Sequence, residues 1–275
     1  MIGYSSMRTL ALARHSFRRS APILIGMAIV LAGFQFLLTQ VAVFLMKNQA
    51  FGLLSSLIPP YIRSMAGPSM VAFMSFGGVV SLGYFHPIVL ASLLGMAIAI
   101  GTEPAAEVES RFADLTLARP MARHEVITRS VIVLVVTIAA LLLLMTAATW
   151  TGLACCTPAT APRPRFALIE TLALMLGATV LCWGGIALAV AAGARRRATA
   201  AGLTAVATLA AYLVDYLGRI WDPARLAARL SPFHYFKPMT LIAGGAMDRA
   251  NLGVLGGIAI AAVALAYLRF ARRDL

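Results

Sequence analysis

Six long apolar stretches constrain the fold of this chain more than any other feature of its sequence. A helix needs about 20 residues to cross the roughly 30 Å hydrocarbon core of a bilayer. The stretches are continuous and lack the alternation of barrel strands, so they predict helices. We therefore expect an all-α integral membrane protein, a single domain over residues 1–275. Its six transmembrane helices are expected at 21–46, 84–102, 126–150, 166–192, 198–217 and 252–270.

The composition agrees with a membrane protein. Hydrophobic residues make up 61% of the chain and charged residues only 12%, too few to cover a water-exposed surface. The net charge of +13 resides in short basic tracts between the apolar runs. Such tracts mark the cytoplasmic side of membrane proteins, so we expect a lipid bilayer and no nucleic acid as a partner.

The distribution of basic residues predicts the orientation. With six spans and both termini inside, the inner segments hold 14 of the 23 basic residues. A seventh span at 65–85 would put either the basic N-terminus or the Arg195–Arg197 cluster on the outer side, against the positive-inside rule. We therefore expect both termini to be cytoplasmic in a plasma-membrane protein. Residues 47–83 are expected outside, partly lying on or dipping into the outer leaflet.

Two segments outside the spans are expected to be helical. Residues 1–20 are basic and precede an apolar run that is too long for a signal peptide. They predict an interfacial helix on the cytoplasmic surface. The outer segment 218–251 contains aromatic residues suited to the membrane interface, among them Trp221 and Tyr235, and predicts short helices.

Catalytic motifs are absent from the sequence. Neither of the two lysines, Lys47 and Lys237, ends a GxxxxGK[ST] loop, and there is no HExxH or GxSxG motif. The histidines and cysteines lack the spacing of metal ligands. We expect a protein that is not an enzyme and binds no metal or cofactor. Any ATP would be bound by another chain.

Two groups of residues within the spans have alternative interpretations. Glu170 and Asp215 are charges in apolar helices, which is costly. They are either structural groups near the outer ends of their helices or part of a substrate pathway open to the outside. Arg219 follows Asp215 by four residues, a spacing that predicts a favourable pair on a helix. Small residues at four-residue spacing let helices approach closely, either within the chain or at a dimer interface. These residues are Gly185, Ala189, Gly253 and Gly257.

The inner loop at 103–125 is the most informative segment. The stretch from Gly101 to Arg129 holds five of the ten acidic residues. Pro104 suits the first turn of a helix, and Pro120 must end one. At helical spacing, one face would carry apolar side chains and another charged ones that can pair along the helix. From the residues alone, this helix either docks to a partner or lies on lipid.

The same loop resembles a family signature. The run AIAIGTEPAAEVESRFADLTLARPMARHEVITR is similar to the segment that joins the second and third spans of ABC-2 type permeases, the membrane subunits of ABC exporters. A typical family run is AGEEERGTLDLLLAHPVSR, and its Gly-Thr falls on Arg111-Phe112 here. The run from Leu230 to Pro238, LSPFHYFKP, is similar to the family's SPF-x-YY-x-P. The residues that match the loop signature in register are Ala105, Glu107, Glu109, Asp114, Leu115, Leu117, Ala118, Pro120 and Arg123.

The resemblance implies a function and partners. In such permeases the loop helix is a coupling helix in a groove of a separate ATPase subunit, which binds ATP and Mg. One six-span chain forms half of a pathway, so two ATPase copies and a second permease are implied, exporting an unidentified substrate. The alternative is a six-span protein outside the family, either a secondary carrier or a sensor or immunity scaffold. The residues implied in ATPase coupling are Glu107, Val108, Glu109, Arg111, Phe112, Asp114, Leu115, Arg119, Pro120 and Arg123.

Overall fold

The computed structural model describes residues 2–52, 72–110, 123–159 and 161–272, and all regular structure in these ranges is helical. Within these ranges, six helical stretches are long and apolar enough to cross a membrane. This confirms the predicted all-α class and the predicted six long apolar helices. The stretches are Ala21–Lys47 within α1 (Ile2–Lys47), Phe76–Gly101 from α4 (Phe76–Ser81) through η1 (Leu82–Tyr84) to α5 (Pro87–Gly101), His124–Cys156 within α8 (Arg123–Cys156), α9 (Phe166–Gly193), α10 (Arg197–Ile220) and α13 (Arg249–Ala271).

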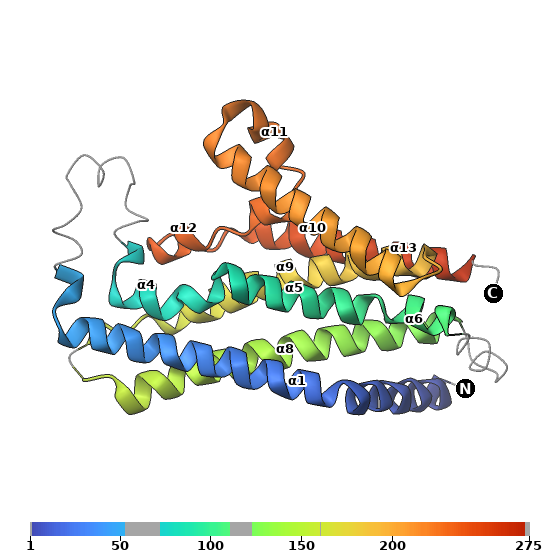
Figure 1. Ribbon diagram of the computed structural model, residues 1–275, viewed down its shortest axis with the longest axis horizontal. Coiled ribbons are helices and arrows are strands. Elements are labelled where there is room, and N and C mark those ends of the chain that lie inside the picture. Colours follow the sequence, from blue (N-terminus) through green and yellow to red (C-terminus); the bar gives the residue numbers. More distant parts are fainter. Residues whose placement is uncertain (1, 53–71, 111–122, 160, 273–275) are drawn as a thin grey trace.

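The long helices form an elongated bundle (Figure 1). α1 packs along α8, and α13 packs along α9. One end of the bundle carries the short helix α6 (Glu103–Glu109), and we call it the α6 end. The first residues of α1 and the last residues of α13 also lie there. α12 (Pro238–Ile242) lies toward the opposite end, the α12 end. α10 rises away from the bundle axis and leads into α11 (Arg225–Ala228).

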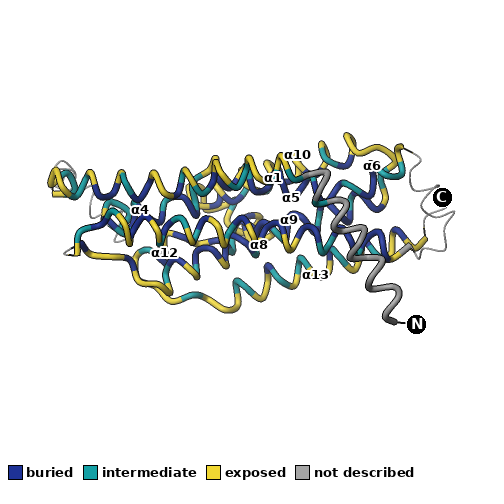
Figure 2. The backbone as a smooth tube through the Cα atoms, turned by 90° about the horizontal axis from the view of Figure 1, so that it is seen from below, coloured by how far each residue is buried: buried dark blue, intermediate teal, exposed yellow. Residues whose placement is uncertain are grey.

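α9 is the central helix of the bundle. It contacts α5, α8, α10 and α13, and its side chains Leu172, Leu176 and Leu188 are completely buried. Large apolar side chains on the outside of the bundle are exposed, for example Ile29, Leu143 and Val206. Figure 2 shows this division between a buried interior and an exposed surface along the helices. An apolar exterior suits a lipid solvent, because lipid-facing side chains need no polar cover.

Glycines bring α5, α8 and α9 close together. A Cβ atom on Gly101 of α5 would lie 2.7 Å from the carbonyl oxygen of Gly184 on α9. A Cβ on Gly184 would in turn lie 2.6 Å from the side chain of Leu134 on α8. Real Cβ atoms do not approach backbone oxygens so closely, so the packing of α5 against α9 requires a residue without a side chain at position 101.

Replacing Gly101 with alanine should therefore destabilise the bundle. We expect the free energy of unfolding to fall by about 1–3 kcal/mol, the usual effect of overpacking, because α5 must move away from α9. Gly95→Ala on the same helix is the matched control, since a Cβ there meets nothing within 4 Å. Thermal unfolding in detergent compares the two variants. Equal midpoints would contradict the close packing of α5 against α9.

The second span begins earlier than the sequence suggested. Residues 76–83 belong to the apolar helical stretch Phe76–Gly101, which therefore starts eight residues before the predicted span at 84–102. The placement of residues 47–83 on the outer side stays a prediction. Ser75 caps α4 by accepting a hydrogen bond from the amide of Gly78. Val80 is completely buried, and its carbonyl accepts a 2.8 Å hydrogen bond from Nε2 of Gln35 on α1. The completely buried Tyr84 hydroxyl bonds Oγ1 of Thr149 on α8 at 2.8 Å.

The N-terminal segment and the first span form one helix. α1 runs from Ile2 to Lys47 and continues through Pro22, where the sequence had suggested a boundary between a surface helix and a span. Proline lacks the amide hydrogen for one backbone hydrogen bond and favours a kink, but here it does not end the helix. The location of residues 1–20 at a membrane surface stays a prediction.

Candidate functional sites at the two ends of the bundle

α6 follows α5 almost directly and lies against the bundle. The hydroxyl of the buried Thr102 donates a 2.8 Å hydrogen bond to the carbonyl of Ile98 at the end of α5. Pro104 occupies the first turn of α6, where its missing amide hydrogen costs nothing. Ala105 is completely buried. The first turn of α6 is therefore fixed by the end of the second span.

An ion pair joins α6 to the third span. Nη2 of Arg129 on α8 lies 2.5 Å from Oε1 of Glu107. The Arg129 side chain is 6% exposed and the Glu107 side chain 20%, so most of the pair is removed from water. An arginine that is buried to this extent requires a negative partner, and Glu107 supplies it.

A second carboxylate joins α6 to the start of the fifth span. Oε2 of Glu109 accepts a 2.9 Å hydrogen bond from the backbone amide of Arg197, the first residue of α10. A negative group is favoured at this position, because the first amides of a helix lack partners within the helix and carry a partial positive charge. The Arg197 side chain also donates a 3.0 Å hydrogen bond to the carbonyl of Ala99 on α5.

Of the residues implied in ATPase coupling, three have described side chains, and these contact the chain itself. Glu107 and Glu109 make the contacts above, and Val108 packs against a buried cluster that includes Ile127, Leu188 and Phe270. The backbone of Arg123 begins α8. The remaining predicted residues lie outside the described part of the chain: Arg111, Phe112, Asp114, Leu115, Arg119 and Pro120.

Two further contacts connect the helices at the α6 end. The hydroxyls of Thr128 on α8 and Tyr267 on α13 are hydrogen-bonded at 2.8 Å. Arg269 of α13 donates a 3.3 Å hydrogen bond to the carbonyl of Ala189 on α9. Because α6 is bound to α8 and α10, and α8 is bound to α13, a displacement of α6 would act on several spans.

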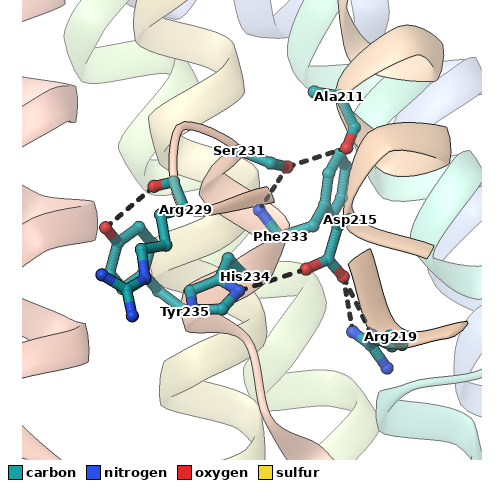
Figure 3. A network of polar contacts seen from close by, with 8 residues as sticks. All are labelled: Ala211, Asp215, Arg219, Arg229, Ser231, Phe233, His234 and Tyr235. Atoms are coloured by element: carbon teal, nitrogen blue, oxygen red, sulfur yellow. Dashed lines mark hydrogen bonds and ion pairs between the residues drawn. The ribbon is translucent and has the colours of Figure 1, made fainter. Parts of the chain in front are cut away.

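The second candidate site surrounds Asp215, near the end of α10 (Figure 3). The Asp215 side chain is 5% exposed, and its Oδ2 accepts hydrogen bonds from Nη2 of Arg219 at 2.6 Å and from Nε at 3.1 Å. Nδ1 of His234 lies 3.5 Å from Oδ1 of Asp215. The sequence spacing predicted the Arg219 pair, and the structure adds His234.

His234 is positioned by a well-bonded turn. It lies in η3 (Pro232–Tyr235), which Ser231 caps by accepting a 3.2 Å hydrogen bond from the amide of Phe233. The Ser231 hydroxyl also donates a 2.9 Å hydrogen bond to the carbonyl of Ala211 on α10. The ring of Phe233 stacks on Trp183 of α9, with centroids 5.6 Å apart. These contacts hold η3 against α9 and α10.

Two cavities meet at Asp215. One, of about 570 Å³, is lined by basic side chains that include Arg219, Arg229 and Lys237. The other, of about 280 Å³, is lined mostly by aromatic and apolar side chains. Asp215, Arg219, Pro238 and Met239 line both cavities.

Glu170 belongs to a different cavity. It is exposed in the second turn of α9 and lines an apolar groove of about 840 Å³ between α8, α9 and α13. The structure therefore does not bring Glu170 and Asp215 into one site. The described residues contain no group of three or more His, Cys, Asp or Glu side chains that could hold a metal ion.

The small residues singled out in the sequence divide into two pairs. A Cβ on Gly185 of α9 would lie 3.1 Å from the carbonyl of Ala259 on α13, and Ala189 is buried between the same helices. This pair packs within the chain. Gly253 and Gly257 of α13 are exposed, and a Cβ on either would meet nothing within 4 Å.

The sequence alone did not identify Arg129, Arg197 and His234 as site residues. Arg129 had one detectable signal, since it is a charge within a predicted span. Arg129, Arg197 and His234 each contact a residue on another helix or turn, distant in the sequence. Only the fold reveals these contacts. Comparisons of this chain with protein-family models and with curated proteins gave no match.

Proposed function

We propose that this chain is the membrane subunit of an ATP-driven exporter of the ABC-2 type, powered by a separate ATPase subunit. The observation that carries the proposal is the position of α6. It follows the second span directly and is bound to the third span through Glu107 and to the fifth through Glu109. The resemblance of the 103–125 loop to the coupling segment of such permeases assigns the same region to the ATPase contact.

The contacts of α6 suggest how movement would reach the spans. A displacement of the loop by the ATPase pulls on α8 through the ion pair between Glu107 and Arg129. It pulls on α10 through the hydrogen bond between Glu109 and the amide of Arg197. In this proposal Glu107, Val108 and Glu109 transmit movement within the chain, and the loop residues that follow bind the ATPase. The α6 end is then cytoplasmic, with both termini on that side.

A second permease copy completes the proposed pathway. The exposed glycines Gly253 and Gly257 leave one face of α13 without a covering helix of the same chain. Small residues suit close helix contacts in lipid, so this face is available to a second copy. The complete exporter would contain two permease chains and two ATPase chains.

The charges within the spans favour this proposal over a secondary carrier. A carrier needs ionisable groups near the middle of the bilayer to bind or exchange ions. In this chain, Arg129, Glu170 and Asp215 all lie in the first or last two turns of their spanning stretches. The middle of each stretch carries no Asp, Glu, Lys or Arg, and His86, between η1 and α5, is the one histidine there.

Co-purification tests the proposal. The tagged chain is purified in detergent with the ATPase encoded nearest to it, and the complex is transferred to lipid nanodiscs for an ATPase assay. We expect a stable complex with about two copies of each chain and a hydrolysis rate that changes in the presence of the permease. Absence of a complex with that ATPase and with every other lone ATPase domain of the cell would contradict the proposal.

A further inference from the structure

The cavities at Asp215 combine two kinds of surface in one place. The larger cavity is lined by the cationic side chains Arg219, Arg225, Arg229 and Lys237, with His234 beside them and Asp215 as the one carboxylate. Asp222 pairs with Arg225 at 3.2 Å and offsets its charge. Arg229 and Lys237 make no ion pair with any described residue. The cavity is therefore positively charged and suited to a negative group.

The adjoining cavity is suited to an apolar group. Its walls include Phe85 and Leu90 of the second spanning stretch, Tyr212 and Tyr216 of α10, and Phe233 and Phe236 of the connecting segment. Phe233 and Phe236 are almost completely buried, and Tyr212 packs edge-on against Phe233 with centroids 5.5 Å apart. Apolar pockets with a few positioned polar groups are the usual form of small-molecule sites.

Arg219 lies where the two cavities meet, and its orientation is fixed. Asp215 accepts hydrogen bonds from its Nε and Nη2 atoms. A guanidinium group has five N–H donors, so two are used by Asp215 and three are left for a ligand. The Arg219 side chain is 59% exposed although Asp215 is buried, so these donors are accessible from the cavities.

From this arrangement we propose that the Asp215 cavities bind an amphiphile with an anionic head group. The head group, a phosphate or carboxylate, is bound by Arg219, Arg229 and Lys237. The apolar part enters the aromatic cavity beside Phe233 and Phe236. Arginine is suited to such a head group because its planar fork pairs with two oxygens at once. Both an anionic lipid of the surrounding bilayer and a separate amphiphile that reaches the protein from solution have this chemistry.

Binding of octyl phosphate to the purified chain in nanodiscs of zwitterionic lipid tests the proposal. Octyl glucoside and inorganic phosphate report on the tail alone and the head group alone. We expect octyl phosphate to bind at least about tenfold more tightly than either, because each of them fills only one cavity. Equal affinities of octyl phosphate and octyl glucoside would overturn the proposal, since the cationic side chains would then have no role.

Two variants locate the binding site. Arg229→Gln combined with Lys237→Gln removes two exposed charges and should weaken octyl phosphate binding about tenfold, with octyl glucoside unaffected. Met239→Glu places a negative charge where the cavities meet and should weaken it similarly. The control, Arg163→Gln with Arg165→Gln, removes two charges from the loop between α8 and α9. Wild-type affinity in both site variants, or equal weakening in the control, would overturn the assignment.

Native mass spectrometry distinguishes the two sources of the ligand. An anionic phospholipid that stays bound to the wild-type chain after detergent purification, but not to the double variant, identifies the bilayer as the source. Octyl phosphate binding by a chain that retains no lipid identifies a ligand from solution. Both results support the site. None of these measurements includes the ATPase, so a failure here is separate from a failure of the proposed exporter function.

Discussion

Replacing Glu107 with glutamine should lower the free energy of unfolding by about 3 kcal/mol, as expected when a buried ion pair loses one partner. The change leaves the charge of Arg129, whose side chain is 6% exposed, without its carboxylate. Glu125 lies one turn earlier on α8 and is buried. Among the described residues it forms no ion pair with Arg129, so Glu107 is the carboxylate that pairs with this arginine in the wild-type fold.

Chemical denaturation in detergent, followed by circular dichroism, measures this effect. Glu103→Gln is the matched control, because Glu103 lies in the same helix and forms no ion pair among the described residues. Its loss should cost below about 1 kcal/mol, the usual size of a helix-terminus effect. A cost for Glu107→Gln no greater than that of the control would contradict the buried pair.

A double variant separates the lost charge partner from other effects of the substitution. Glu107→Gln combined with Arg129→Met removes both charges and leaves an unbranched apolar side chain in the place of arginine. Apolar replacements of buried ion pairs are often neutral or stabilising. The double variant should therefore recover most of the stability that Glu107→Gln loses. If the stability lost by the double variant equals the sum of the losses of Glu107→Gln and Arg129→Met alone, the two side chains do not interact.

The spans could be predicted from the sequence because the signal is local. Each one is a continuous apolar run, and no long-range contact is needed to recognise it. The exception is the start of the second span. Residues 76–83 are apolar, but the distribution of basic residues argued against a further span at 65–85. Phe85 and His86 also interrupt the helical stretch before α5 begins at Pro87. The burial of residues 76–84 depends on α1 and α8, through Gln35 and Thr149.

At the candidate sites, too, the sequence predicted contacts between residues close in the chain but not contacts between distant ones. The pair of Asp215 and Arg219 was predictable, because residues four apart on a helix are neighbours. The hydrogen bond between Glu109 and the amide of Arg197 joins residues 88 positions apart, and no sequence spacing indicates it. The loop signature assigned Glu107 and Glu109 to a partner. Their contacts within the chain became visible only once α6 was placed beside α8 and α10.

Replacing Phe112 with aspartate should abolish ATP-driven export while membrane insertion and expression stay normal. Phe112 lies outside the described residues, so this prediction comes from the sequence. It is one of the residues that the resemblance of the 103–125 loop to a coupling segment implies in ATPase coupling, and in the proposed function the loop residues that follow α6 bind the ATPase. A carboxylate buried in an apolar groove costs several kcal/mol, enough to lower coupled transport by at least about tenfold.

Transport in proteoliposomes that contain the permease and its ATPase measures the effect, with ATP hydrolysis recorded in the same vesicles. The matched control is Leu226→Asp, which introduces the same charge at an exposed apolar residue of α11, away from the α6 end. We expect the control to transport like the wild type and Phe112→Asp to hydrolyse ATP without export. If Phe112→Asp transports normally, the loop at 103–125 does not receive the movement of the ATPase, and the contacts of Glu107 and Glu109 serve only to stabilise the fold.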